Sequence, residues 1–259
     1  MKPLLSVITP TYNAEEFVKE GVQSISWQTL NKKQYEWIIL DDGSVDNTVG
    51  KLKKYVGSFN NFYLFSRNKN FGTSATREQA INLSEGKYLV FFDVDDILEK
   101  NALESTLNFM ESNPHIKFSY SRHKRIDKNG GFICDRPGYG FFRENLLHFN
   151  FVGPLKCIYR ELHNEINGFD SSFFKYSEDY DYILRISESL NRNQIKQNPD
   201  YLYRYRIHPD NNMKKIKDMR KNACLAIQNS LKRKEGINAD VFWSHLTEDK
   251  YNYYDWRVK

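Results

Sequence analysis

Cysteine is scarce in this chain, and its three residues lie far apart. Cys134, Cys157 and Cys224 form no C-x-x-C pair and are odd in number. This pattern predicts neither a disulfide framework nor a zinc site, and it fits a reducing compartment best. The sequence also lacks an apolar run long enough to span a membrane, and the apolar run near its start is too short for a signal peptide. We therefore expect a cytoplasmic protein that is not integral to a membrane.

Two glycine-rich phosphate-binding motifs are missing as well. The sequence contains neither G-x-G-x-x-G nor G-x-x-x-x-G-K-[ST]. Their absence argues against a dinucleotide-dependent oxidoreductase and against a P-loop NTPase. A ligand that carries phosphate would therefore need another source of positive charge.

The composition is that of an ordinary globular protein. Hydrophobic residues make up 40% of the 259 residues and charged residues 27%, which argues against disorder of the whole chain. The length suits one large domain with a buried core, and it is short for two full domains. We expect a catalytic domain over residues 1–212 and a basic helical extension over residues 213–259.

Positive charge gathers in this extension. The net charge is +5, and the late clusters are Lys214, Lys215, Lys217, Arg220 and Lys221, followed by Lys232-Arg233-Lys234. The ordinary interpretation is a solvated helix face. The alternative is attraction to anionic lipid at the inner face of the membrane, or to an acidic acceptor. We expect no nucleic-acid partner.

Hydrophobic patterning predicts an α/β fold. Four short segments indicate buried strands, and helical patterns fall between them: Leu4–Thr9, Trp37–Leu40, Phe62–Phe65 and Tyr88–Phe92. Such alternation predicts βαβ units and a Rossmann-like, mostly parallel sheet flanked by helices. From about Lys117 the pattern becomes irregular, with turns between short aromatic strands. Asp179–Leu190 indicates one further helix, with Ser177 as a candidate N-cap.

Polar residues follow each of the four predicted strands. In an open parallel sheet, ligands bind beyond the carboxyl ends of the strands. Asp93 and Asp95 follow the last strand, and two carboxylates there can help to place Mg²⁺ or Mn²⁺, hard cations that bridge phosphate oxygens. Taken alone, these aspartates could equally cap the next helix, and Asp41-Asp42-Gly43 alone more often marks a turn than a binding site.

The order and spacing of the blocks separate these alternatives. The chain contains S-V-I-T-P-T-Y-N at 6–13, I-L-D-D-G-S-V-D at 39–46, Asn70-Phe71-Gly72 with Arg77, and F-F-D-V-D-D at 91–96. In this order the blocks closely resemble the nucleotide-binding half of family-2 glycosyltransferases with the GT-A fold. The resemblance covers roughly residues 4–210. It implies an inverting, metal-dependent transfer of a sugar from a nucleotide diphosphate, with a UDP-sugar as donor and Mn²⁺ or Mg²⁺ as cofactor.

The resemblance also implies roles for single residues. Asp95 would ligate the metal, Asp93 would contact the ribose or belong to the metal shell, and His208 would reach back to the metal or diphosphate. A lone histidine is more often structural, so His208 has two interpretations. The implied nucleotide-binding residues are Thr9, Pro10, Tyr12, Asp41, Asp42, Arg77, Asp93 and Val94.

The second half contributes an acidic pair, Glu178-Asp179, at the start of the predicted helix. The resemblance implies that this pair lies beside the acceptor, with Asp179 as general base. A carboxylate makes chemical sense there, because an acceptor hydroxyl is a poor nucleophile until its proton is removed. The alternative is that Glu178, Asp179 and Asp181 merely favour a helix N-terminus.

Two other functions stay open. A non-catalytic nucleotide-sugar binding or scaffold protein would keep Asp42 and Asp95 without a working base. A sugar nucleotidyltransferase usually carries a glycine-rich, basic N-terminal loop, which Thr9–Asn13 is not. We expect a transferase whose acceptor is a saccharide or a lipid-linked saccharide, in the synthesis of bacterial surface polysaccharide or glycolipid.

Overall fold

The first third of the chain alternates strands and helices, as the sequence predicts. The structure is a computed structural model, and it describes residues 2–57, 59–173, 176–208, 216–244 and 253–258. All four predicted strands are confirmed within a few residues. The elements are β1 (Leu5–Thr11), α1 (Val18–Ser26), β2 (Tyr35–Asp41), α2 (Thr48–Val56), β3 (Phe62–Ser66), α3 (Thr73–Asn82) and β4 (Tyr88–Phe91).

The remaining elements follow a less regular order. They are β5 (Ile97–Leu98), α4 (Ala102–Glu111), β6 (Phe118–Ile126), β7 (Phe132–Arg136), α5 (Arg143–Leu146), β8 (Lys156–Tyr159), α6 (Arg160–Glu165), α7 (Glu178–Ser189), η1 (Arg192–Gln194), β9 (Ile195–Arg206), α8 (Ile216–Glu235), β10 (Ala239–Ser244) and β11 (Tyr253–Val258).

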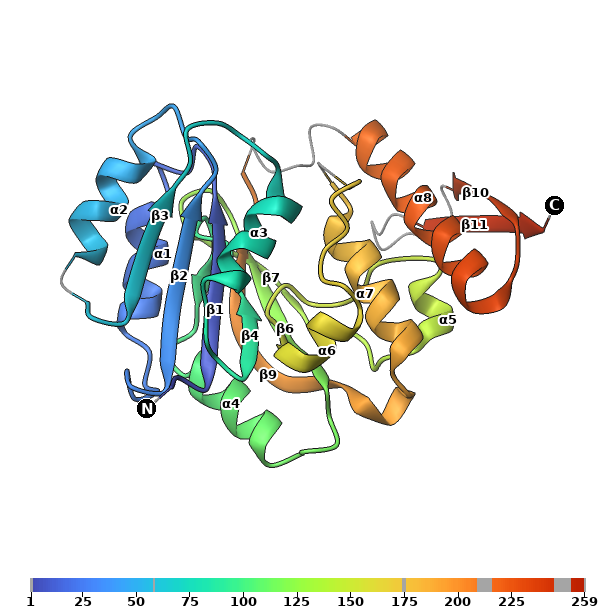
Figure 1. Cartoon of the computed structure of the whole chain (residues 1–259), viewed down its shortest axis with the longest axis horizontal. Helices are drawn as coiled ribbons and strands as arrows, with labels where there is room; N and C mark the ends of the chain where they lie inside the picture. Colours follow the sequence, from blue (N-terminus) through green and yellow to red (C-terminus); the bar gives the residue numbers. More distant parts are fainter. Residues whose placement is uncertain (1, 58, 174–175, 209–215, 245–252, 259) are drawn as a thin grey trace.

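One curled sheet carries both parts of the chain (Figure 1). In the described residues its strand order is β3-β2-β1-β4-β8-β6-β9-β5, and β7 pairs with β6. The first four strands are parallel, as expected, whereas β8 runs antiparallel to β4 and to β6. The prediction of a mostly parallel sheet therefore holds for the first part, and the second part is mixed.

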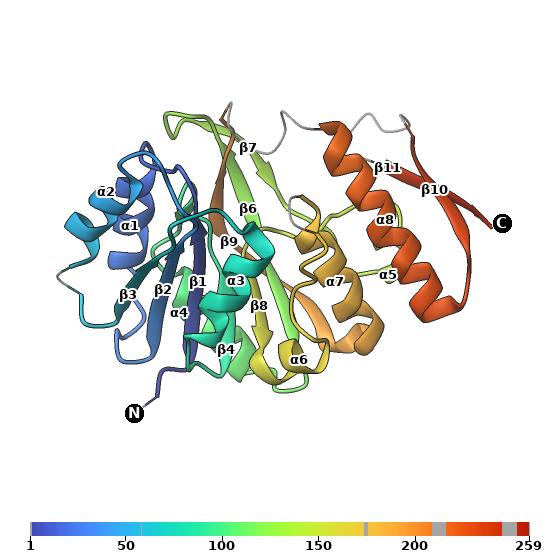
Figure 2. The same cartoon turned by 45° about the horizontal axis from the view of Figure 1, so that its top comes forward.

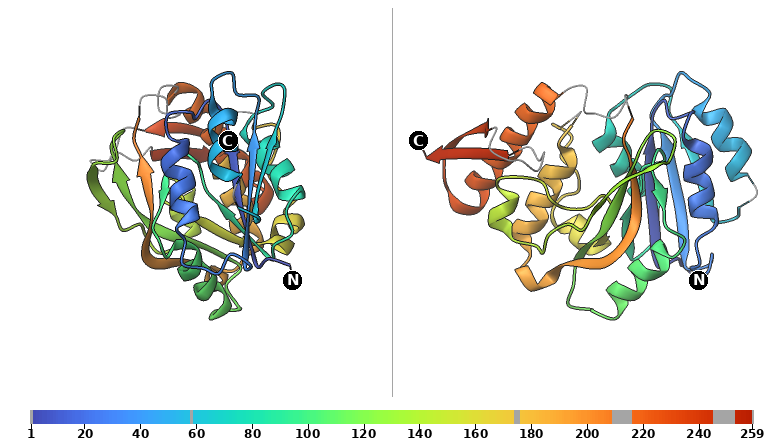
Figure 3. Two further views of the ribbon diagram at one scale, coloured as in Figure 1. Left: turned by 90° about the vertical axis from the view of Figure 1, so that its left-hand side faces the viewer. Right: turned by 180° about the vertical axis from the view of Figure 1, so that it is seen from behind.

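Helices cover both faces of the parallel part, and so its strands are apolar on both sides. Every residue of β2 is buried, as are all but one of β1. In Figures 2 and 3, α1 and α2 lie on one face of these strands and α3 on the other. Burial on both faces explains why these strands are continuous apolar runs rather than alternating ones.

The C-terminal extension contains the expected helix, but it is not wholly helical. α8 packs along α7, with Ala226, Ile227 and Leu231 fully buried in the common core. The chain then forms an antiparallel pair, β10 and β11, which the sequence did not predict. The expected boundary at 212/213, Lys214 and Lys215 lie outside the described residues.

Ser177 is the N-cap residue of α7 as predicted, but its side chain makes no capping hydrogen bond to the helix. Its backbone is left-handed, with φ of 62°, and its hydroxyl donates to the carbonyl oxygen of Met219 in α8 at 3.0 Å.

In the described part of the chain, no helix is both long and apolar enough to cross a membrane.

Candidate active site

A cleft of about 790 Å³ opens beyond the carboxyl ends of β1, β2 and β4. This is the end of a parallel sheet at which ligands bind, because the loops that leave neighbouring strands converge there. The sequence-predicted residues that line it are Pro10, Tyr12, Asp42, Arg77, Asp93, Val94, Asp95, Glu178 and His208. Blocks more than a hundred residues apart thus meet in one site, as the spacing predicted.

The acidic loop after β4 meets His208 from the end of β9. His208 Nε2 lies 3.1 Å from Asp95 Oδ2, and the His208 ring packs against Phe17 with centroids 4.5 Å apart. The Asp93 side chain is 45% exposed and that of Asp95 31% exposed, so both carboxylates are accessible from the cleft. Asp93, Asp95 and His208, the three predicted metal residues, therefore line the same cleft.

Buried polar groups fix that loop from behind. Arg206 is almost fully buried, and its Nε donates to the carbonyl oxygen of Asp95 at 2.7 Å. Asp96 accepts hydrogen bonds from the Arg206 backbone at 2.7 Å and from the Tyr203 hydroxyl at 2.6 Å. Burial and the neighbouring Asp95 raise the pKa of Asp96 well above its usual range. Asp96 is therefore a support for the loop.

The loop also explains a glycine inside α1. A Cβ on Gly21 would lie 2.2 Å from the carbonyl oxygen of Val94, which is closer than any side chain could tolerate. Only glycine lets the helix approach the acidic loop this closely.

Asp42, which also lines the cleft, is held in a fixed position. Its carboxylate accepts the backbone N–H groups of Phe71 at 3.0 Å and Gly72 at 2.9 Å. Arg67 Nη1 donates to the same carboxylate at 3.1 Å. Tyr12 is 48% exposed and presents its ring to the cleft. An aromatic ring can stack on a nucleotide base, and a fixed carboxylate can accept a hydrogen bond from an N–H of that base.

Two of the predicted nucleotide contacts do not reach the cleft. Thr9 is fully buried, and its hydroxyl accepts the Trp37 indole N–H at 2.7 Å. Asp41 is also buried, and its carboxylate accepts the hydroxyl of Ser44 and, at 3.0 Å, the Ser44 backbone N–H. These side chains build the strand and the turn beneath the site, and a contact of either residue with a nucleotide stays a prediction.

Arg77 joins the cleft to the start of α7. Its Nη1 donates to Glu178 Oε1 at 2.9 Å and its Nη2 to Asp93 Oδ1 at 3.2 Å. Burial lowers the pKa of Arg77, but Asp93 and Glu178 more than offset this, and the net pKa is raised. The guanidinium is occupied by carboxylates, so it positions Asp93 and Glu178 in this structure.

The three acidic residues at the start of α7 have different environments. Glu178 is buried against Arg77. Asp181 is buried too, and its Oδ2 accepts Arg185 Nε at 2.8 Å. The Asp179 side chain is 40% exposed, and its nearest cation is Lys156, with Nζ 3.8 Å from Oδ2. Asp179 is therefore the most exposed carboxylate of the three, whereas Glu178 is the one that lines the cleft.

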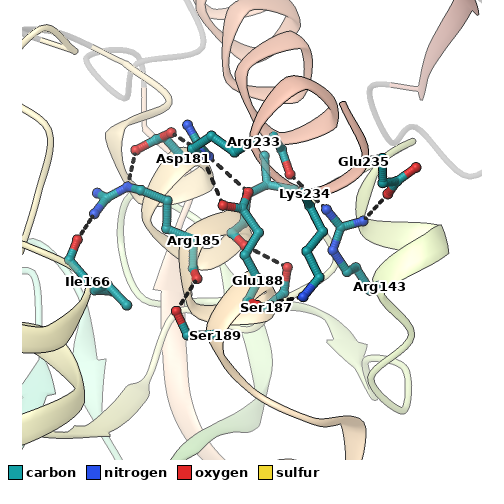
Figure 4. A network of polar contacts seen from close by, with 12 residues as sticks. Arg143, Ile166, Asp181, Arg185, Ser187, Glu188, Ser189, Arg233, Lys234 and Glu235 are labelled. Carbon is teal, nitrogen blue, oxygen red and sulfur yellow. Dashed lines mark hydrogen bonds and ion pairs between the residues drawn. The ribbon is translucent and has the colours of Figure 1, made fainter. Parts of the chain in front are cut away.

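A network of ion pairs ties α8 to α7 behind the acidic pair (Figure 4). Arg233 donates to both carboxylate oxygens of Glu188, at 2.8 and 2.9 Å, and lies 3.5 Å from Asp181. Lys234 Nζ donates to the Glu188 carbonyl oxygen at 3.0 Å. Two of the late cations, for which a solvated helix face or attraction to lipid was expected, thus bind Glu188 within the molecule.

Sequence reasoning missed Lys156, Arg67 and Arg206. Lys156 opens a buried strand, K-C-I-Y, in which every residue is buried. A lysine in such a strand is a signal that could have been used, because lysine is seldom buried without a partner. Arg206 lies in the segment Tyr205–His208, in which the sequence analysis assigned a role to His208 alone.

Among the described residues, no three His, Cys, Asp or Glu side chains form a metal cluster.

Comparison with known proteins agrees with this geometry. A profile described as "Glycosyl transferase family 2" matches residues 6–169. An uncharacterized glycosyltransferase of Methanocaldococcus jannaschii is 29% identical over 93% of this chain and 84% of its own. A poly(ribitol-phosphate) beta-glucosyltransferase of Bacillus spizizenii is 28% identical over 80% of this chain, but this covers only 32% of that protein.

Solved structures share the fold. S. aureus TarS 1-349 in complex with UDP-GlcNAc matches 91% of this chain and 68% of its own, with a TM-score of 0.74 and 22% identity. The mannosyltransferase PcManGT of Pyrobaculum calidifontis, in complex with GDP-Man and Mn2+, matches 90% of this chain and 65% of its own, with a TM-score of 0.68 and 17% identity. At these identities the likeness concerns the fold.

Proposed function

The chain belongs to glycosyl transferase family 2, and on that premise we propose that it moves a sugar from a UDP-sugar to an acceptor hydroxyl with inversion at the anomeric carbon. The observation that carries the proposal is one cleft lined by Tyr12, Asp42, Asp95 and His208. Glu178 at the start of α7 also lines it, and the exposed carboxylate of Asp179 is the next residue along the helix.

Asp95 and His208 fit a divalent cation. A carboxylate oxygen and an imidazole nitrogen 3.1 Å apart form a mixed O and N donor pair, which suits Mn²⁺ better than Mg²⁺ because Mg²⁺ prefers oxygen ligands alone. The match to PcManGT, whose complex contains Mn2+, supports this choice. When bound, the cation would supply positive charge for the diphosphate oxygens.

In this proposal, residues of the chain itself accept the proton and position the neighbouring side chains. Asp179 accepts the proton of the acceptor hydroxyl as that oxygen attacks the anomeric carbon. Lys156 lies beside the Asp179 carboxylate, and Arg77 holds both Glu178 and Asp93 by ion pairs. Attack on the face opposite the diphosphate inverts the anomeric carbon in one step.

The acceptor is proposed to be a saccharide or lipid-linked saccharide of a surface polysaccharide or glycolipid. The similarity to a poly(ribitol-phosphate) beta-glucosyltransferase supports this class. Peripheral association with the inner face of a membrane is part of the proposal. It would depend on exposed cations of α8 such as Lys221 and Lys232, because Arg233 and Lys234 bind Glu188.

A donor panel tests the proposal. UDP-GlcNAc, UDP-glucose and GDP-mannose are each incubated with the protein and Mn²⁺, and the released nucleotide is measured. We expect release of UDP from a UDP-sugar and little GDP. Binding without any nucleotide release, with every acceptor supplied, would favour the scaffold alternative, and release of pyrophosphate would favour a nucleotidyltransferase.

A further inference from the structure

The two residues before α7 have a backbone conformation that is unusual outside glycine. Tyr176 and Ser177 are both left-handed, with φ of 66° and 62°. Residues with a side chain seldom adopt this conformation, because Cβ crowds the following carbonyl oxygen. It persists only where the surrounding structure holds it. We call Tyr176 and Ser177 the left-handed turn.

The left-handed turn leads directly into the acidic pair. Tyr176 and Glu178 line the cleft, whereas the hydroxyl of Ser177 between them is turned to α8. The carbonyl oxygen of Ser177 accepts the Asp181 backbone N–H at 3.0 Å, so the left-handed turn is joined to the first turn of α7. The conformation of the left-handed turn therefore sets where α7 begins, and with it the place of Asp179.

Two hydrogen bonds join the left-handed turn to α8. The Ser177 hydroxyl donates to the carbonyl oxygen of Met219 at 3.0 Å. The side-chain amide of Asn222 donates from Nδ2 to the carbonyl oxygen of Tyr176 at 3.3 Å. Met219 and Asn222 are three residues apart and therefore lie on one face of α8. Each residue of the turn thus has its own hydrogen bond to the same face of this helix.

α8 is itself fixed against α7 and can act as a rigid support. The two helices lie side by side in Figures 1 and 2, and Ala226, Ile227 and Leu231 of α8 are fully buried in the common core. Further along, Arg233 binds Glu188 near the other end of α7 (Figure 4). α8 therefore contacts both the residues that precede α7 and the last turn of that helix.

Backbone strain of this kind is typical of sites that need a fixed geometry. A general base must lie within hydrogen-bond reach of the proton that it accepts, and a displacement of about 1 Å can cost about a hundredfold in rate. Resting on the function proposed above, we propose that α8 holds the left-handed turn and thereby places Asp179 for proton transfer. Ser177 and Asn222 are then positioning residues, and α8 is part of the catalytic unit.

The experiment compares variants of the intact chain that lack one hydrogen bond to α8. Asn222→Ala removes the amide and Ser177→Ala the hydroxyl. Ser177→Asn is the conservative variant, because asparagine tolerates the left-handed conformation and can donate a hydrogen bond. Asn229→Ala is the matched control, since it makes the same change seven residues further along α8.

Four quantities are measured for each variant. They are the rate of UDP release from saturating UDP-GlcNAc or UDP-glucose with Mn²⁺, the affinity for UDP by calorimetry, hydrogen exchange of the segment 176–184 by mass spectrometry, and thermal unfolding as the check on folding. Exchange reports on the support of the left-handed turn whether or not a donor reacts.

We expect Asn222→Ala and Ser177→Ala each to lower the rate of UDP release about tenfold to a hundredfold. UDP affinity should stay close to that of the wild type, because Asp42 is fixed by hydrogen bonds of its own. Exchange of the segment 176–184 should become about tenfold faster or more, since α8 no longer holds the turn. Ser177→Asn should keep most of the rate, and Asn229→Ala should match the wild type throughout.

The proposal is overturned if folded Asn222→Ala releases UDP at the wild-type rate, if exchange of the segment is unchanged, or if Ser177→Asn is no better than Ser177→Ala. UDP affinity that falls in step with the rate would assign the left-handed turn to donor binding and also contradict it. Ser177→Ala supplies a second variant should Asn222→Ala not fold. If the wild type releases no UDP from either donor, the proposed function fails instead, and exchange still tests the support of the turn.

Discussion

The part formed by β1 to β4 with their helices, which we call the donor half after its proposed ligand, differs in construction from β6 to β9 with α7 and α8, which we call the acceptor half after its proposed ligand. The donor half consists of neighbouring βαβ units, and its key carboxylate, Asp42, is fixed by backbone N–H groups of a nearby loop. The acceptor half consists of strands and helices brought together over long separations, and ion pairs hold its carboxylates. Nucleotide binding and proton transfer should therefore be separable by mutation.

Asp179→Asn should separate proton transfer from nucleotide binding most clearly, and it has the largest expected effect. This change keeps the size and polarity of the side chain but removes the proton acceptor. We expect sugar transfer to fall by about 10²–10⁴-fold, with UDP affinity close to that of the wild type. The measurement is turnover with a true acceptor beside calorimetry of UDP. Near wild-type turnover of Asp179→Asn would mean that the base lies elsewhere.

Arg77→Met should affect both halves of the molecule at once, because Arg77 forms ion pairs with Asp93 of one half and Glu178 of the other. Its loss leaves Glu178 buried without a counter-charge and releases Asp93. We expect a loss of about 3–5 kcal/mol in the free energy of unfolding, measured by urea denaturation. Arg77→Lys, which keeps the charge but not the two-pronged geometry, should lose less. Equal stability of Arg77→Met and wild type would contradict the buried ion pairs.

Asp181→Asn should give a smaller effect that is confined to stability. Asp181 is turned to Arg185 and Arg233 rather than to open space. Loss of its charge should cost about 1–3 kcal/mol of unfolding free energy, and the folded fraction should transfer sugar at the normal rate. Glu188→Gln, at the other end of the same network, is the matched control. A large loss of turnover in folded Asp181→Asn would reassign the base.

The two halves also differ in how far the sequence predicts them. In the donor half, local hydrophobic patterns predicted each strand, and the family resemblance implied that His208 reaches the acidic loop that carries Asp95. The burial of Thr9 and Asp41 could not be predicted, because motif position does not reveal which side of a strand a side chain takes. In the acceptor half, Lys156 next to Asp179 and the α7–α8 ion pairs depend on distant pairing, which periodicity cannot reveal.

The most direct test of the account is the affinity of UDP with and without Mn²⁺, for wild type and Asp95→Ala, by calorimetry. Without the cation the diphosphate faces Asp93 and Asp95, so like charges oppose binding. The account predicts that Mn²⁺ strengthens UDP binding to the wild type and that Asp95→Ala removes this gain. Equal UDP affinity with and without Mn²⁺ in the wild type would contradict it.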